Sequence, residues 1–197
     1  MSSIAKLFGL VLSGGKSTRM GKDKGLIEYH GVPQREYLYQ LLSRVCDQTF
    51  ISLREEQEEN VPFGYATLTD EDKYRGPFNG ILSAHNRHPK AAWLILACDL
   101  PLIDLPALKQ LIQERNTKKL ATAFANEKDP LPEPLCAIWE PHGLEKAISY
   151  LEAGNGTCPR KFLINNDTHL VFPENKNVIL NANSQEDYQE ALSKLTT

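Results

Sequence analysis

The sequence predicts an α/β protein with a mainly parallel sheet flanked by helices. Apolar runs of strand length alternate with amphipathic segments of helical periodicity along the 197 residues, a pattern typical of repeated strand–helix–strand units. A glycine-rich basic loop directly follows the first apolar run, as expected where a parallel strand ends and a ligand-binding loop begins. A chain of this length is enough for one well-filled domain. We therefore expect a single domain over residues 1–197.

The first half of the chain alternates strands and helices in a regular order. Leu7–Leu12 is a continuous apolar run of the kind found in buried parallel strands. Apolar residues at helical spacing follow over residues 34–45. The other elements expected in this half are strands at residues 49–53, 65–69 and 93–97, a solvated acidic segment at residues 55–59, and helices that begin near Gly76 and, capped by Asp104, near Pro106.

The second half is less regular. Strands are expected at residues 120–125 and 135–139, on either side of a proline-rich segment at residues 129–134. Prolines lack the backbone donor that a central strand needs, so we expect this segment to be a loop on the substrate side. The other expected elements are helices at residues 141–151, 159–164 and from Ser184, with Asp187 completing a capping box, and strands at residues 169–172 and 178–180.

Composition excludes several classes of function. The formal net charge is −3, so nothing in the overall charge favours nucleic acid or an acidic membrane as a partner. The four cysteines have no Cys-x-x-Cys spacing, which argues against a zinc site and a disulfide framework. We expect no signal peptide before the first strand, and no apolar run approaches the ~20 residues that cross a bilayer. We expect a cytoplasmic monomer without nucleic-acid or membrane partners.

The segment from Leu12 to Lys24 carries the strongest chemical signal. It holds three glycines, three lysines and one arginine in thirteen residues. Gly14 and Gly15 allow the backbone to approach a ligand closely, and N–H groups at the end of a strand can face an anion. A Walker A loop is excluded because Leu10 stands where its first glycine belongs, and the Gly-x-Gly-x-x-Gly fingerprint is absent. We expect this loop to hold phosphate in another way.

Carboxylates follow two of the expected strands. Asp99 comes after a fully apolar run, where burying an unpaired carboxylate is costly. Asp70 follows the strand at residues 65–69 and is the favoured candidate there, although the neighbouring Glu71 or Asp72 could occupy that site instead. Ligands of open α/β sheets bind beyond the carboxyl ends of the strands, and Mg²⁺ takes one or two carboxylates together with phosphate oxygens. Asp99 is therefore the expected magnesium ligand.

The run Leu-Ser-Gly-Gly-Lys-Ser-x-Arg-Met-Gly-x-Asp-Lys-Gly that starts at Leu12 closely resembles the signature of nucleotidyltransferases of the molybdenum cofactor guanylyltransferase type. The resemblance extends over almost the whole chain. It implies a Rossmann-like, nucleotide-diphospho-sugar-transferase-like fold, with a nucleotide-binding half at about residues 1–104 and an acceptor-binding half at about residues 105–197. The implied reaction is Mg²⁺-dependent transfer of GMP from GTP to the terminal phosphate of molybdopterin, with release of pyrophosphate.

The resemblance also implies roles for individual residues. Arg19 would contact phosphates, Lys24 would neutralise charge at the α-phosphate, and Asp99 would hold the metal. The implied nucleotide-binding residues are Leu12, Ser13, Gly14, Gly15, Lys16, Arg19, Lys24, Asp70, Gly76, Pro77 and Asp99. The implied acceptor-binding residues are Pro134, Arg160, Lys161, Asn181 and Asn183. Arg160 and Lys161 are included because Gly156 stands where family members commonly carry an arginine.

Three alternatives stay open. Related cytidylyltransferases typically carry Ala-Ala-Gly where Ser13, Gly14 and Gly15 stand, so the double glycine favours guanine. Sugar-nucleotide pyrophosphorylases share the fold but usually have longer chains. A non-catalytic nucleotide- or cofactor-binding protein would not need Arg19, Lys24 and Asp99 together. The expected partners are GTP and molybdopterin, and transient contact with a molybdoenzyme or a cofactor-insertion protein is a further expectation.

Overall fold

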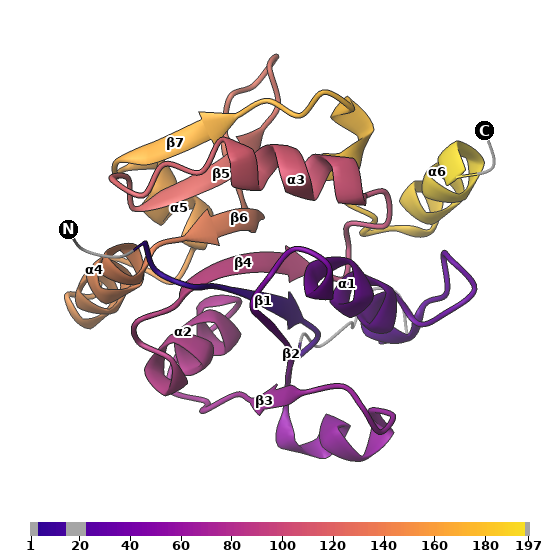
Figure 1. Ribbon diagram of the computed structural model, residues 1–197, viewed down its shortest axis with the longest axis horizontal. Helices are drawn as coiled ribbons and strands as arrows, with labels where there is room; N and C mark the ends of the chain where they lie inside the picture. Colours follow the sequence, from indigo (N-terminus) through magenta and orange to yellow (C-terminus); the bar gives the residue numbers. More distant parts are fainter. Residues whose placement is uncertain (1–3, 15–22, 196–197) are drawn as a thin grey trace.

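A seven-stranded sheet forms the centre of the molecule (Figure 1). The computed structural model describes residues 4–14 and 23–195, and in these residues the strand order is β3-β2-β1-β4-β6-β5-β7. Strand β6 runs antiparallel to both of its neighbours, and the other pairs of adjacent strands are parallel. The prediction of a mainly parallel sheet is therefore confirmed.

The strands are β1 (Leu7–Leu12), β2 (Gln48–Leu53), β3 (Thr67–Thr69), β4 (Ala92–Ala97), β5 (Ala121–Ala125), β6 (Pro132–Trp139) and β7 (Thr168–Val171). The α-helices are α1 (Gln34–Ser43), α2 (Phe78–Arg87), α3 (Leu105–Gln113), α4 (Pro141–Glu152), α5 (Pro159–Ile164) and α6 (Gln185–Leu195). The short 3₁₀ helices of the described residues are η1 (Lys24–Leu26), η2 (Glu55–Asn60) and η3 (Lys176–Ile179). Across the described ranges, no helix is both long enough and apolar enough to cross a membrane.

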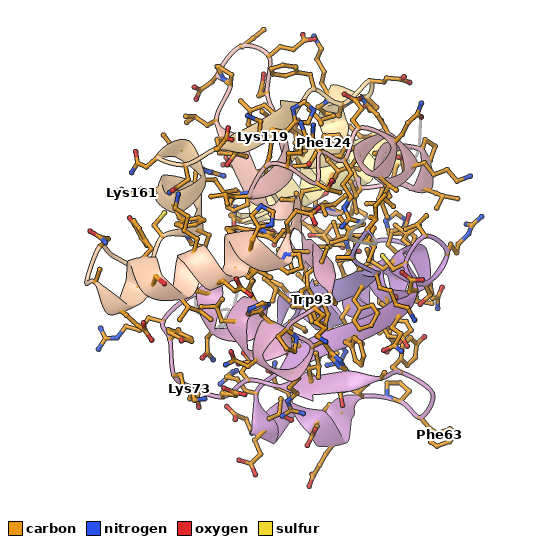
Figure 2. The ribbon with its side chains drawn as sticks, turned by 60° about the vertical axis from the view of Figure 1, so that its left-hand side comes forward. Phe63, Lys73, Trp93, Lys119, Phe124 and Lys161 are labelled. Atoms are coloured by element: carbon orange, nitrogen blue, oxygen red, sulfur yellow. The ribbon has the colours of Figure 1, made fainter. Side chains whose placement is uncertain are left out.

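Two hydrophobic clusters cover the two faces of the sheet. Helices α1 and α3 pack on one face, and α2, α4 and α5 pack on the other. Strand β4 is buried along its whole length: Leu94 and Leu96 face the first cluster, while Trp93 and Ile95 face the second, as the period of two in a strand requires. Figure 2 shows Trp93 in the interior and Phe63 projecting outward. Burial on both faces explains why β4 reads as a continuous apolar run.

The expectation of a loop throughout the proline-rich segment is wrong for its second half. Strand β6 begins at Pro132 and lies between β4 and β5, inside the sheet. Its ladder with β4 covers only residues 136–139, so both prolines of the strand lie beyond that ladder. The pairing of β6 with β5 shifts register between Ala123 and Ala125. The missing proline donors therefore break no hydrogen bond with β4.

The strand expected at residues 178–180 is also wrong. Val178 and Ile179 belong to η3, whose first turn is capped by the Asn175 side chain accepting a hydrogen bond from the Asn177 N–H at 3.1 Å. A run of three apolar residues is too short for its periodicity to separate helix from strand. Val178 is buried in the cluster beneath α3, so burial explains its apolar character.

Helix α4 packs closely against the start of β5 at Gly143. A Cβ atom on Gly143 would lie 2.2 Å from the Leu120 carbonyl oxygen and 2.9 Å from its carbonyl carbon. Both are backbone atoms, and the Leu120 oxygen also accepts a hydrogen bond from the Glu140 N–H at 3.0 Å. The first turn of α4 can therefore approach this strand only with glycine at that position.

Substitution Gly143→Ala is expected to lower the free energy of unfolding by roughly 1–3 kcal/mol, the usual cost of overpacking. In a helix interior, alanine is more stable than glycine by about 1 kcal/mol. The collision must therefore cost more than this gain. Urea unfolding followed by circular dichroism measures the difference. The exposed neighbour His142, replaced by alanine, is the control and should change little. An unchanged or higher stability of Gly143→Ala would contradict the close packing.

Candidate active site

A cavity of about 610 Å³ opens at the carboxyl ends of β1 to β4. Eight of the residues predicted to bind nucleotide line it: Leu12, Ser13, Gly14, Lys24, Asp70, Gly76, Pro77 and Asp99. The predicted residues Gly15, Lys16 and Arg19 lie outside the described residues. The structure thus brings together, from five separate stretches of the chain, the described part of the predicted nucleotide site.

The register of the sheet places these segments side by side. Leu12, the last residue of β1, is paired with Ala97, the last residue of β4. Just beyond β1, the Ser13 N–H donates to the Ser52 carbonyl of β2 at 3.0 Å. The glycine loop therefore leaves the sheet between the ends of β2 and β4, directly beside the residues that follow β4.

Asp99 stands two residues beyond β4 with its carboxylate largely buried. Its Oδ2 lies 3.9 Å from Lys24 Nζ, and its Oδ1 is buried without a hydrogen-bond partner among the described residues. Burial raises the pKa of Asp99 above the usual aspartate value; the Lys24 ammonium group opposes this shift and the Glu133 carboxylate adds to it. An unsatisfied, poorly solvated carboxylate oxygen is a suitable ligand for a cation.

Lys24 connects the two halves of the site. It is the first residue of η1, a turn capped by the Asp23 side chain, which accepts a hydrogen bond from the Gly25 N–H at 2.9 Å. The Lys24 ammonium group donates to Asn183 Oδ1 at 2.7 Å. Asn183 belongs to the segment before α6, where Asp187 accepts from the backbone N–H groups of residues 183 and 184. The lysine thus reaches from the nucleotide loop to a residue predicted to bind the acceptor.

Asp70 faces the cavity from the end of β3. Its Oδ1 accepts a hydrogen bond from Ser52 Oγ at 2.6 Å; burial raises its pKa, and this hydrogen bond opposes the increase. Among the neighbouring acids, Asp72 also lines the cavity. Glu71 instead accepts from Asn86 at 3.0 Å and pairs with Lys73 at 2.7 Å, away from the cavity. Asp70 and Asp72 therefore both face the cavity, and Asp70 is the more buried of the two.

Gly14 is fixed by its neighbours. A Cβ atom on Gly14 would lie 2.8 Å from Asp70 Oδ2 and 3.7 Å from the Arg54 side chain. An alanine here would have to displace the Asp70 carboxylate, whose other oxygen is held by Ser52. The glycine lets the backbone lie directly against Asp70.

The residues predicted to bind the acceptor do not all meet. Arg160 lines a second cavity, of about 380 Å³, and pairs with Glu133 at 2.6 Å. The Asn181 amide also donates to Glu133, at 3.4 Å. Pro134 lines neither cavity, and its carbonyl accepts from the buried Trp139 indole at 3.0 Å. Lys161 lines neither cavity and points away from the molecule in Figure 2.

Sequence reasoning missed several polar residues around the site. Arg54 lines the first cavity, Glu133 lines the second, and Gln57 is buried beside the glycine loop. The expectation that residues 55–59 are solvated holds for the four glutamates, which are exposed, but not for Gln57. An uncharged residue among four glutamates was the available signal. For Glu133 no signal separated it from its neighbouring prolines.

Comparison with protein families and curated proteins identifies relatives over most of the chain. Residues 9–169 match the family described as MobA-like NTP transferase domain. The chain is 42% identical over 183 residues to the molybdenum cofactor biosynthesis bifunctional protein of Synechocystis, covering 92% of this chain but 52% of that protein. It thus spans about half the length of this relative. It is 30% identical over 180 residues to the molybdenum cofactor guanylyltransferase of Pseudomonas fluorescens, covering 90% of this chain and 89% of that protein.

Solved structures share the fold. Molybdopterin-guanine dinucleotide biosynthesis protein A from Archaeoglobus fulgidus superposes with a TM-score of 0.78 at 20% identity, covering 96% of this chain and 98% of that one. A CMP:2-keto-3-deoxy-manno-octonic acid synthetase complexed with CTP superposes with a TM-score of 0.73 at 12% identity. The superposition covers 98% of this chain and 99% of that one. At these identities the likeness concerns the fold alone. Because the family model matches residues 9–169, the chain belongs to the MobA-like NTP transferase domain family and is a nucleotidyltransferase.

Proposed function

We propose that the protein transfers GMP from GTP to the terminal phosphate of molybdopterin, or of the molybdenum cofactor, and releases pyrophosphate. The observation that carries this proposal is the position of Lys24, whose ammonium group contacts Asn183 at 2.7 Å and lies 3.9 Å from Asp99. One cation is thus shared by the candidate nucleotide and acceptor sides. The names of the most similar curated relatives support guanylyl transfer in particular.

The reaction requires two anions to approach each other. An oxygen of the acceptor phosphate forms a bond to the α-phosphorus of GTP, and the bond from that phosphorus to the bridging oxygen of pyrophosphate breaks. We assign to Lys24 the stabilisation of the negative charge that develops around the α-phosphorus. The backbone at Ser13 and Gly14 positions the nucleotide. Burial raises the pKa of the nearby Cys98 thiol to about 12, so this thiol stays protonated and is not a nucleophile.

The residues present fit a magnesium ion. The buried Asp99 Oδ1 has no hydrogen-bond partner among the described residues, and we propose it as the protein ligand. Within residues 4–14 and 23–195 no three His, Cys, Asp or Glu side chains gather as a metal site. Mg²⁺ commonly keeps several waters and binds one or two carboxylates together with phosphate oxygens, so one aspartate suffices. The ion, when bound, supplies neutralisation of the triphosphate charge.

Gly14 favours guanine over cytosine as the base. The cytidylyl alternative is associated with alanine at this position, and a Cβ here would collide with Asp70 Oδ2 at 2.8 Å. Residues 1–104 are assigned to nucleotide binding and residues 105–197 to acceptor binding. We still predict that the protein is a cytoplasmic monomer that binds neither nucleic acid nor membrane. We also predict transient contact with a molybdoenzyme or a cofactor-insertion protein.

Nucleotide preference tests the proposal directly. Isothermal titration with GTP, CTP, ATP and UTP, each with Mg²⁺ and again with EDTA, should show preference for GTP that depends on Mg²⁺. Preference for CTP would move the protein to the cytidylyl alternative. A protein that binds GTP but releases no pyrophosphate when molybdopterin is added would be a binding protein rather than a transferase.

Substitution Lys24→Ala should lower kcat by roughly 10²–10³-fold, the usual effect of removing one group that stabilises transition-state charge. The measurement is pyrophosphate release at saturating GTP and acceptor. Lys119→Ala is the matched control, because Lys119 pairs with Asp167 at 2.5 Å and lines neither cavity. Full turnover by Lys24→Ala would exclude the proposed role.

Substitution Asp99→Asn should abolish Mg²⁺-dependent nucleotide binding without lowering thermal stability. The raised pKa of Asp99 means that its ionisation opposes folding above that pKa. The neutral amide removes this opposition, so at neutral pH the melting temperature should stay the same or rise. Below the ordinary aspartate pKa, Asp99 is protonated in both the folded and the unfolded state, so the difference between the proteins should vanish there. A lower melting temperature at neutral pH would show that the carboxylate stabilises the fold.

A further inference from the structure

The 3₁₀ helix η2 lies against both ends of the glycine loop. Gln57, in its centre, has 7% of its surface exposed, whereas the four glutamates around it are exposed. Its Nε2 donates to the Ser13 carbonyl at 3.2 Å and to Asp23 Oδ2 at 2.8 Å. Ser13 is the residue after β1, and Asp23 precedes η1. One side-chain nitrogen therefore joins the point where the loop leaves the sheet to the point just before Lys24.

Arg54 strengthens this connection. Its Nε donates to the Gly14 carbonyl at 2.8 Å, and its guanidinium pairs with Glu56. The Arg54 backbone N–H donates to Gln57 Oε1 at 3.1 Å. The carboxamide of Gln57 is thus oriented by one contact on its oxygen, which directs both N–H donors toward the loop.

The contact reaches Lys24 through Asp23. The Asp23 carboxylate accepts from Gln57 on Oδ2 and from the Gly25 N–H on Oδ1 at 2.9 Å. The second bond caps the turn whose first residue is Lys24. Fixing the Asp23 side chain therefore fixes the backbone from which the Lys24 ammonium group extends to Asn183 and Asp99.

The chemistry of the position suits glutamine. Ser13 offers a carbonyl oxygen, and both carboxylate oxygens of Asp23 accept hydrogen bonds here. A primary amide supplies two donors on one nitrogen and an acceptor for the Arg54 N–H, and it carries no charge. A glutamate here would place a second carboxylate against Asp23 and supply no donor.

We infer that Gln57 is a positioning residue for nucleotidyl transfer: it ties Ser13 to Asp23 and thereby sets the position of Lys24. This inference rests on the proposed function. Displacing a reacting group by about 1 Å costs roughly 100-fold in rate, so Gln57→Ala should lower kcat by roughly 10–100-fold. The effect requires Lys24, because Lys24 is the group that Gln57 positions.

A double-mutant cycle separates this role from a general structural one. The variants are Gln57→Ala, Lys24→Ala and the pair, assayed for kcat and for KM of GTP. If Gln57 acts through Lys24, adding Gln57→Ala to Lys24→Ala should change kcat by less than about threefold, because coupled residues are not additive. Full additivity of the two losses would refute the inference. Glu55→Ala, an exposed position in the same 3₁₀ helix, is the control and should retain wild-type kcat.

An exchange of amide and carboxylate gives a second test. Gln57→Glu alone should lose activity, and adding Asp23→Asn should restore kcat severalfold, since the new amide can donate to the new carboxylate while its oxygen still accepts from Gly25. Gln48→Glu adds the same charge at the opposite end of β2, where the residue is exposed, and controls for charge alone. No recovery in the double variant, with the protein folded by circular dichroism, would count against the contact.

Amide hydrogen exchange keeps the two proposals distinguishable. Opening the contact in Gln57→Ala should speed exchange of the Gly25 N–H, whether or not the protein is active. Faster exchange in Gln57→Ala, together with a wild-type protein that transfers no GMP, would refute the proposed function and leave the contact established. Unchanged exchange, together with additive losses in an active protein, would refute the positioning role alone.

Discussion

The parallel pairing of β1 with β4 is the constraint on which the rest of the site depends. Both strands are buried, and their last residues, Leu12 and Ala97, are paired. The register therefore decides that the glycine loop and Asp99 leave the sheet at the same level. A shift of one residue would also turn every side chain of β4 to the opposite face, placing Trp93 against α1 and α3. The packing of the core and the meeting of loop and carboxylate are thus fixed by the same hydrogen-bond ladder.

The site combines groups that a protein selected only for stability would avoid. Asp99 and Asp70 both have raised pKa values because their carboxylates are poorly solvated, and each carries a cost to folding when ionised. Lys24 offsets part of this cost at Asp99, although the 3.9 Å separation leaves room for a ligand to contribute more. Such unsatisfied groups are typical of sites that gain stability when their ligand binds. The well-packed apolar clusters on both faces of the sheet carry the stability that the site lacks.

Much of the fold could be predicted because its strongest elements are apolar runs that are buried on both sides. The strand at Leu7–Leu12, the carboxylate after β4 and the capping of α6 by Ser184 and Asp187 follow from local pattern. What failed depends on tertiary context: β6 accepts prolines because its ladder with β4 stops at Cys136, which no local signal in the sequence reveals. In the candidate site, Gly14, Lys24, Asp70 and Asp99 were predicted from the loop motif and the strand ends, and all four line the first cavity. Gln57 and Glu133 were not, because each acts through partners distant in sequence.

The reversed direction of β6 has a consequence for how such enzymes can diversify. Because β6 runs opposite to β4, its first residues, rather than its last, reach the edge of the sheet where Asp99 lies. The connection that leads into it, residues 126–131, is exposed and precedes the ladder with β4. Exposed connections tolerate insertion and exchange far better than strands do. Selection can therefore remodel this connection while the parallel strands that border the first cavity stay unchanged.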